Sequence, residues 1–95
     1  MTVTCLYDLT ARPDMRAEMA QSLMTLEQAV QACPGCLGTA LLTDAGDATK
    51  FVFIEHWQTL EARDAAGTAL GKSLFGPIMA ASATPPARRL LQPSE

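Results

Sequence analysis

A carboxylate, an imidazole and an indole stand side by side near the middle of the chain. Glu55, His56 and Trp57 end an apolar run that starts at Phe51. In a strand, successive side chains point to opposite faces, so Glu55 and Trp57 share a face with Phe53 while His56 faces the other way. A carboxylate among aromatic side chains can act as a base or bind a polar group in an apolar cleft.

His56 is the chain's single histidine and therefore the candidate proton shuttle. A general acid or base works together with partner groups, and no acidic partner shares its face in this motif. The alternative interpretation, which we favour, is a hydrogen-bonded residue at a strand end or at a dimer interface.

Cys33 and Cys36 have the CxxC spacing, and Cys5 is the third cysteine. A redox-active pair needs a lowered thiol pKa, which usually comes from a helix N-terminus. Cys33 instead falls at the C-terminal end of an expected helix, whose dipole disfavours a thiolate. A turn with an apolar thiol on each side is the better interpretation. Because a structural zinc site needs four ligands and only His56 could join the cysteines, we expect no metal site.

Alternation and helical spacing predict the elements that position these residues. Alternating side chains predict strands over residues 2–9, 36–43 and 51–57, with a turn at 44–47 between the last two. Apolar residues spaced by three and four predict a helix over 13–33, opened by Pro13. A second helix is expected from Thr59 to about Ala66, after which Gly67 and Gly71 loosen the chain. A short helical stretch over 74–79 then follows, restarted or kinked at Pro77. Residues 88–92 predict an edge strand between prolines.

The resulting order, β-α-β-β-α-β, is the ferredoxin-like arrangement, in which both helices pack on one face of a four-stranded antiparallel sheet. We expect one domain over residues 1–95. The strand over 51–57 is apolar on both faces, and one helical layer covers only one of them. A second copy of the sheet would cover the other face, so we expect a two-fold homodimer.

Charge and hydropathy exclude several classes of partner. The chain has a net charge of −3 and no basic run beyond two arginines, so nucleic acid is not an expected ligand. No segment approaches the ~18–20 uninterrupted apolar residues of a membrane-spanning helix. The first residues lack the basic start of a signal peptide, and we expect a cytoplasmic protein.

Several segments together resemble the antibiotic-biosynthesis monooxygenase (ABM) family. They are PGCL at 34–37, FVFIEHW at 51–57 followed by TLEA at 59–62, and LLQP at 90–93. The resemblance implies a dimeric α/β barrel with a pocket between sheet and helices in each subunit. It also implies either cofactor-independent oxygenation of aromatic polyketides and quinol precursors or haem degradation.

Two departures from the family pattern argue against haem degradation. The haem-degrading branch uses a histidine from the helical region and an asparagine on the first strand. This chain has no histidine after His56 and no asparagine at all.

Tyr7 is expected near Phe53, Glu55 and Trp57, because the first and third strands are adjacent in the inferred fold. From the resemblance to the ABM family we expect a cofactor-independent monooxygenase acting on a small phenolic or quinol-like molecule, which can itself reduce oxygen once deprotonated. Glu55 or Tyr7 would assist that deprotonation. The alternative is a non-catalytic dimeric protein that binds a small molecule in the same pocket. The candidate pocket residues are Tyr7, Phe53, Glu55, Trp57, Phe75 and Met79.

Overall fold

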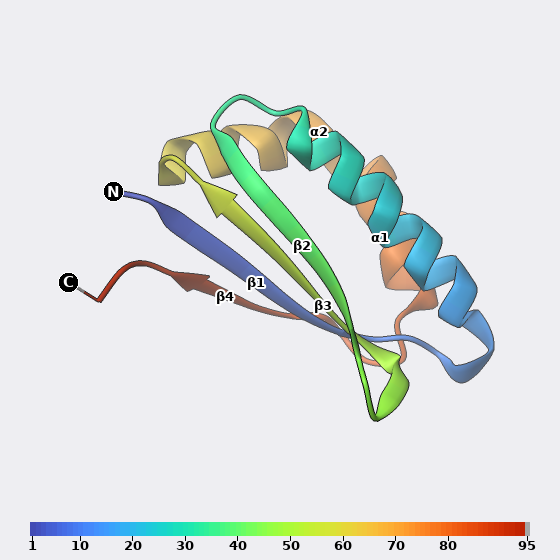
Figure 1. Cartoon of the computed structure of the whole chain (residues 1–95). Helices are drawn as coiled ribbons and strands as arrows, with labels where there is room; N and C mark the ends of the chain where they lie inside the picture. Colours follow the sequence, from blue (N-terminus) through green and yellow to red (C-terminus); the bar gives the residue numbers. More distant parts are fainter. Residues whose placement is uncertain (95) are drawn as a thin grey trace.

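The chain forms four strands and two long helices in a computed structural model that describes residues 1–94. Figure 1 shows both helices lying on one face of the sheet. The order β1-α1-β2-β3-α2-β4 confirms the predicted ferredoxin-like α+β fold. The elements are β1 (Val3–Thr10), a 3-10 turn (Pro13–Met15), α1 (Arg16–Gln31), β2 (Cys36–Asp44), β3 (Asp47–Trp57), α2 (Leu60–Ala81) and β4 (Ala87–Leu91).

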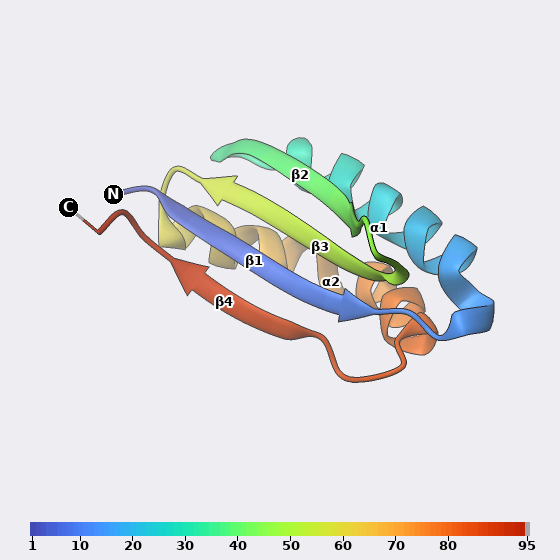
Figure 2. The same cartoon turned by 60° about the horizontal axis from the view of Figure 1, so that its bottom comes forward.

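The sheet is antiparallel, with strand order β2-β3-β1-β4. Figure 2 shows β1 and β3 in its centre and β4 along one edge, as the prolines before and after β4 predicted. In the register of the central pair, Cys5 lies opposite Glu55 and Tyr7 lies opposite Phe53. Tyr7 also lies opposite Arg88 of β4. This register places Tyr7 beside Phe53, on the same face of the sheet as Glu55 and Trp57.

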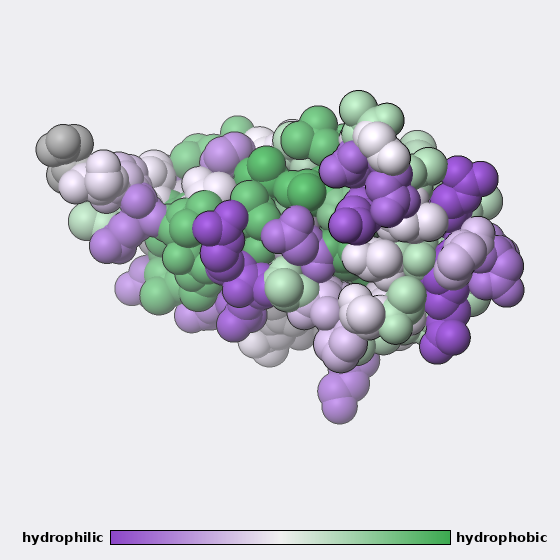
Figure 3. Space-filling view, turned by 90° about the horizontal axis from the view of Figure 1, so that it is seen from below, coloured by the Kyte–Doolittle hydropathy of each residue, from purple (hydrophilic) through white to green (hydrophobic). Residues whose placement is uncertain are grey.

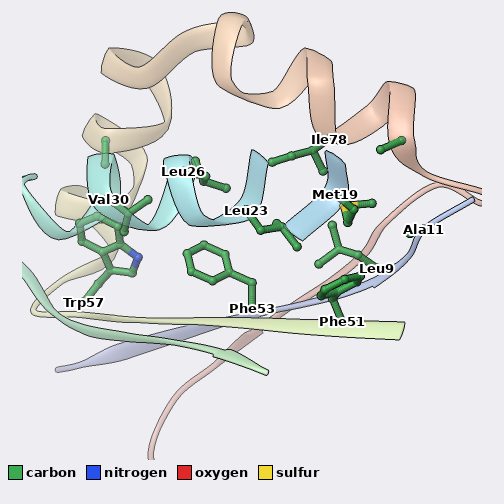
Figure 4. Packing of buried hydrophobic residues seen from close by; sticks show 12 residues of the cluster. Leu9, Ala11, Met19, Leu23, Leu26, Val30, Phe51, Phe53, Trp57 and Ile78 are labelled. Atoms are coloured by element: carbon green, nitrogen blue, oxygen red, sulfur yellow. The ribbon is translucent and has the colours of Figure 1, made fainter. Parts of the chain in front are cut away.

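The core lies between the sheet and the helices, as Figure 4 shows. In α1 the buried residues recur at spacings of four and three, which confirms the predicted amphipathic helix. From β3, Phe53 and Trp57 point toward the helices. The helical residues of the same buried cluster are Met19, Leu23, Leu26, Val30, Ala66, Ile78 and Ala81.

Helix α2 differs from the prediction in where it ends and bends. It begins as expected, because the Thr59 hydroxyl accepts a hydrogen bond from the Ala62 N–H at 3.1 Å. It continues past Ala66, however, and its backbone leaves helical geometry at Gly71, with φ 65° and ψ −170°. Gly71 can adopt this conformation because it has no Cβ. Pro77 keeps helical backbone angles, so the predicted restart or kink at Pro77 is wrong, and the break lies at Gly71, one of the two glycines expected to loosen the chain.

Strand β3 starts earlier than residue 51, the predicted start. The Asp44 carboxylate accepts a hydrogen bond from the Gly46 N–H at 2.7 Å, and this tightens the turn. Asp47 already pairs with Asp44, so residues 47–50, which are polar except for Ala48, belong to the strand. Side-chain polarity hid this extension from the sequence prediction.

The opposite face of the sheet, here called the open face, is covered by no helix, and Figure 3 shows apolar side chains across its centre. These residues alternate with the core residues along each strand. Leu42 is 53% exposed, and all five residues of β4 are exposed. The apolar side chains of the open face are Leu6, Ala40, Leu42, Val52, Ile54 and Leu91.

Candidate active site

Two adjoining cavities lie between the sheet and the helices. The outer cavity has a volume of about 310 Å³, and the inner cavity has a volume of about 50 Å³. Tyr7 and Phe75 line both cavities and form the boundary between them. The predicted pocket residues line one or both. Tyr7, Phe53, Phe75 and Met79 line the outer cavity, and Tyr7, Glu55, Trp57 and Phe75 line the inner one.

The outer cavity is apolar and suits a flat ring. Tyr7 and Phe53 stack along its floor, with ring centroids 6.1 Å apart and planes inclined by 21°. Leu23 and Leu26 of α1 line it as well, while Met79, 53% exposed, lies at the rim. Arg88 also lines it, from the exposed edge strand. Pockets of this kind bind planar ligands through apolar contact.

The inner cavity contains a buried carboxylate. Glu55 is only 4% exposed, and one carboxylate oxygen accepts a hydrogen bond from Trp57 Nε1 at 2.9 Å. Burial raises the pKa of Glu55, although the bond from Trp57 and the charge of Arg63 oppose that rise. The Glu55 carboxylate is therefore a stronger base than an exposed one, and the indole holds it in a fixed orientation.

Tyr7 and Arg63 stand on the other side of the inner cavity. Arg63 Nη2 donates to the Tyr7 hydroxyl at 3.4 Å, and Nη1 pairs with the exposed Asp64 carboxylate at 3.2 Å. Burial raises the pKa of Tyr7 to about 12, with additional contributions from Cys5 and Glu55. Tyr7 is therefore a neutral phenol at neutral pH and acts as a hydrogen-bond donor rather than as a base.

Arg63 is the site residue that the sequence prediction missed. Its side chain is 15% exposed, and it lies on the face of α2 that meets the sheet. A signal was present in the sequence. Residues 62, 63, 66 and 70 follow helical spacing, so an arginine occurs within a stripe of small and apolar residues. A charge on the buried stripe of a helix is a sign of function or of a buried partner.

The three cysteines are free thiols in the structure. Cys5 is fully buried opposite Glu55, and burial raises its pKa, so it is a neutral thiol. Cys33 Sγ donates to the Ala29 carbonyl at 3.4 Å, and Cys36 Sγ donates to the Gly38 carbonyl at 3.8 Å. Burial also raises the pKa of Cys33. These contacts are those of structural thiols at a turn.

His56 lies on the open face, where its Nδ1 is 3.0 Å from the Thr4 hydroxyl. It is exposed and lines neither cavity. Its position gives no geometric support to a proton-shuttle role in the site.

A wider depression of about 430 Å³ lies at the other end of the sheet, beside the turn between β2 and β3. Its lining is more charged, with Asp8, Asp44 and Lys50, and it contains none of the predicted pocket residues. The paired cavities under the helices are therefore the candidate site, because they combine an apolar wall with a few convergent polar groups.

The family model for antibiotic biosynthesis monooxygenase matches residues 2–68. The chain belongs to this family. The matched segment contains Tyr7, Glu55, Trp57 and Arg63, so all the polar residues that line the inner cavity lie within the ABM region. Within residues 1–94, the ABM chain has no helix that is long and apolar enough to cross a membrane.

Solved structures of related proteins share the fold of this ABM chain. A candidate antibiotic biosynthesis monooxygenase from Nitrosomonas europaea has a TM-score of 0.90 at 16% identity, covering 98% of this chain and 90% of that chain. Rv0793 from Mycobacterium tuberculosis has a TM-score of 0.84 at 19% identity, covering 100% of this chain and 97% of that chain. SnoaB, a cofactor-independent oxygenase from Streptomyces nogalater, has a TM-score of 0.84 at 18% identity, covering 99% and 94% of the two chains. No curated protein matches the sequence.

Proposed function

We propose that this ABM-family chain is a cofactor-independent monooxygenase that oxidises a small planar phenol or quinol, with Glu55 as the base. The observation that carries the proposal is the buried Glu55 carboxylate, fixed by Trp57 at the inner end of an apolar cavity. A related fold in SnoaB, a cofactor-independent oxygenase, is consistent with this chemistry.

The proposed reaction begins with proton transfer. The phenol O–H bond breaks, its proton binds to a Glu55 oxygen, and the electron pair stays on the ligand as a phenolate. The phenolate is electron-rich enough to reduce molecular oxygen itself. A new C–O bond then forms at a ring carbon, and the O–O bond and the C–H bond of that carbon break. The second oxygen leaves as water, with the proton from that carbon and the proton held by Glu55. A phenol oxidised to a quinone in this way consumes one O₂ and releases one H₂O, with no other reductant.

The remaining residues bind and orient the ligand. The Tyr7 and Phe53 rings form a flat wall against which an aromatic ligand stacks. Phe75 and Met79 of the second half of α2 line the opposite side of the outer cavity, with Met79 at its rim. An apolar site that holds the base and the ring in one orientation lowers the entropic part of the barrier.

We also propose a homodimer in which the open faces of two sheets meet. Its support is the apolar side chains on that face, together with the exposure of all five residues of β4. A chain of this size buries only roughly 60–65% of its unfolded surface alone, so a second apolar interface adds substantially to its stability. A two-fold axis makes the same patch serve both partners.

The test of the enzymatic proposal is oxygen uptake with a panel of naphthols, anthrones and quinols. We expect at least one compound to be converted to a quinone, with one O₂ consumed per product and one oxygen atom from ¹⁸O₂ in the product. Binding without oxygen uptake would identify a non-catalytic binding protein instead. If the Glu55→Gln variant still binds the ligand and turns it over at the wild-type rate, Glu55 is excluded as the base.

A further inference from the structure

The inner cavity is too small for a ring but admits a polar substituent. Its volume of about 50 Å³ exceeds the ~10–15 Å³ that one water molecule needs and is far below the ~150 Å³ of a cavity that binds benzene. Since Tyr7 and Phe75 line both cavities, a ring in the outer cavity would direct one substituent between them. That substituent meets Arg63, Tyr7 and Glu55, the polar side chains of the inner cavity.

The guanidinium of Arg63 has donors to spare for such a group. Of its five N–H groups, two are engaged within residues 1–94, one by Tyr7 and one by Asp64. Asp64 is itself largely exposed, so its charge is well screened by water. The positive charge of Arg63 therefore remains available to the inner cavity.

The hydroxyl of Tyr7 adds a second donor. Arg63 donates to the Tyr7 oxygen, so the phenolic proton of Tyr7 points away from Arg63, either toward the neighbouring Cys5 thiol or toward a ligand in the cavity. A donor that itself accepts a hydrogen bond from a cation is polarised, and it binds an anion more strongly than an isolated hydroxyl does.

We propose that Arg63 and Tyr7 form an anion-binding pair that holds the ionised oxygen of the ligand, so that the site selects planar aromatic ligands with an acidic hydroxyl group. This inference rests on the proposed function and specifies its ligand class. Arg63 is a binding residue in this arrangement, and Glu55 remains the base.

The charges balance on proton transfer. Before transfer, the negative charge lies on Glu55 near the Arg63 guanidinium; afterwards it lies on the ligand oxygen, and Glu55 is neutral. The net charge of the cavity is unchanged, and Arg63 compensates both states. A hydroxyl with a low pKa gives up its proton at the smallest cost, which is why acidic ligands are favoured.

Arg88 is the competing candidate for an anion partner. It lines the outer cavity opposite Tyr7, but it lies on the exposed edge strand, where water screens its charge. A partly buried guanidinium discriminates between charged and neutral ligands more strongly than an exposed one.

Two probes of nearly the same shape test the inference by isothermal titration calorimetry. They are 2-hydroxy-1,4-naphthoquinone, which is an anion at pH 7, and 2-methoxy-1,4-naphthoquinone, which is neutral. We expect the hydroxy compound to bind at least roughly tenfold more tightly, the scale of one hydrogen bond to a charged group. Glu55→Gln, which removes the competing negative charge, should increase this preference.

The variants assign the preference to a residue. Arg63→Gln should reduce it to less than about threefold, Arg63→Lys should keep part of it, and Arg88→Gln should leave it nearly unchanged. Tyr7→Phe should lower the preference for the hydroxy compound by several-fold, and the variant should still bind the methoxy compound. Thermal melting of each variant shows whether the fold is intact.

Three results would overturn the inference. Equal binding of the two probes by the wild-type protein would show that no anion site exists, while leaving the proposed pocket in place. If the preference for the hydroxy compound is lost in Arg88→Gln but kept in a folded Arg63→Gln variant, the anion binds beside Arg88 in the outer cavity and not beside Arg63. Binding of neither probe would contradict the proposed function itself, and this inference with it.

Discussion

The two faces of strand β3 have the same kind of sequence but different environments. On the covered face, Phe53, Glu55 and Trp57 are each at most 4% exposed. On the open face, Val52 and Ile54 are half-buried and His56 is exposed. The side chains alternate between the faces, so residues next to each other in sequence belong to different surfaces.

Polar residues on the two faces find different hydrogen-bond partners. On the covered face, Glu55 needs a partner inside the protein, and Trp57 supplies one at 2.9 Å. On the open face, His56 contacts Thr4 and also reaches solvent. A buried polar group on the covered face is therefore a candidate for chemistry, whereas the open face is suited to association.

The largest expected effect comes from Glu55→Gln on the covered face. Gln keeps the side-chain shape and can accept the Trp57 N–H, but it is no base. We expect turnover of a substrate to fall at least roughly 100-fold, the scale of general base catalysis. Glu61→Gln, on the exposed first turn of α2, is the matched control and should keep full activity.

The same substitution should stabilise the fold, with a defined dependence on pH. Because burial raises the pKa of Glu55 above its ordinary value of 4.5, the folded state binds this proton more tightly than the unfolded state. The contribution of Glu55 to stability is then complete below pH 4.5 and is lost as the pH rises through the folded-state pKa. We expect Glu55→Gln to gain roughly 1–2 kcal/mol at pH 7 and nothing at low pH, measured by urea unfolding. The same difference in unfolding free energy between variant and wild type at both pH values would contradict the burial argument.

The next effect concerns the open face. Ile54→Lys places a charge in the centre of the proposed interface, and we expect the dimer dissociation constant to rise by roughly 100-fold or more, because an unpaired charge would be buried. Met24→Lys makes the same change on the outer surface of α1, where Met24 is 48% exposed, and should leave the dimer intact. Sedimentation velocity across a concentration series measures both. A wild-type monomer, or a dimer that tolerates Ile54→Lys, would exclude association through this face.

The covered face was largely predictable from sequence, because alternation assigns faces directly. The spacing in residues 51–57 placed Glu55 and Trp57 on one face, and the inferred strand order brought Tyr7 near them. The register pairs Tyr7 with Phe53, and Tyr7, Glu55 and Trp57 line one cavity. Both inferences depend only on the period of a strand and on the order of elements.

Helix α2 was less predictable, because backbone geometry there depends on single residues. The sequence offers both a glycine and a proline as places to bend, and local pattern does not rank them; the structure bends at Gly71. Arg63 was missed for a related reason. Which face of a helix turns toward the sheet depends on where the helix starts and how long it runs, and the predicted helix was too short for the stripe to stand out.

A smaller effect should distinguish packing from binding at Trp57. Trp57→Phe keeps an aromatic ring in the core but loses the indole N–H that holds Glu55. We expect a loss of about 1–3 kcal/mol in unfolding free energy from imperfect repacking. If Trp57 also positions the base, turnover should fall by more than ligand affinity does. A variant that loses only stability, with kcat unchanged, would show that the Trp57–Glu55 contact has no catalytic role.

The smallest effect tests the helical layer that encloses the covered face. Gly71 has a backbone conformation that is nearly restricted to glycine, with φ 65° and ψ −170°, whereas Gly76 lies in regular helix. A Cβ at either position would meet no atom within 4 Å, so the two substitutions differ only in backbone energy. We expect Gly71→Ala to lower the unfolding free energy by about 1–2 kcal/mol and Gly76→Ala to raise it by about 0.5–1 kcal/mol. Because Gly71 precedes the segment that bears Phe75 and Met79, Gly71→Ala should also weaken binding in the outer cavity, and Gly76→Ala should not. Equal effects of the two substitutions in chemical denaturation would mean that α2 is a continuous helix in solution, and that the outer cavity needs no bend at Gly71.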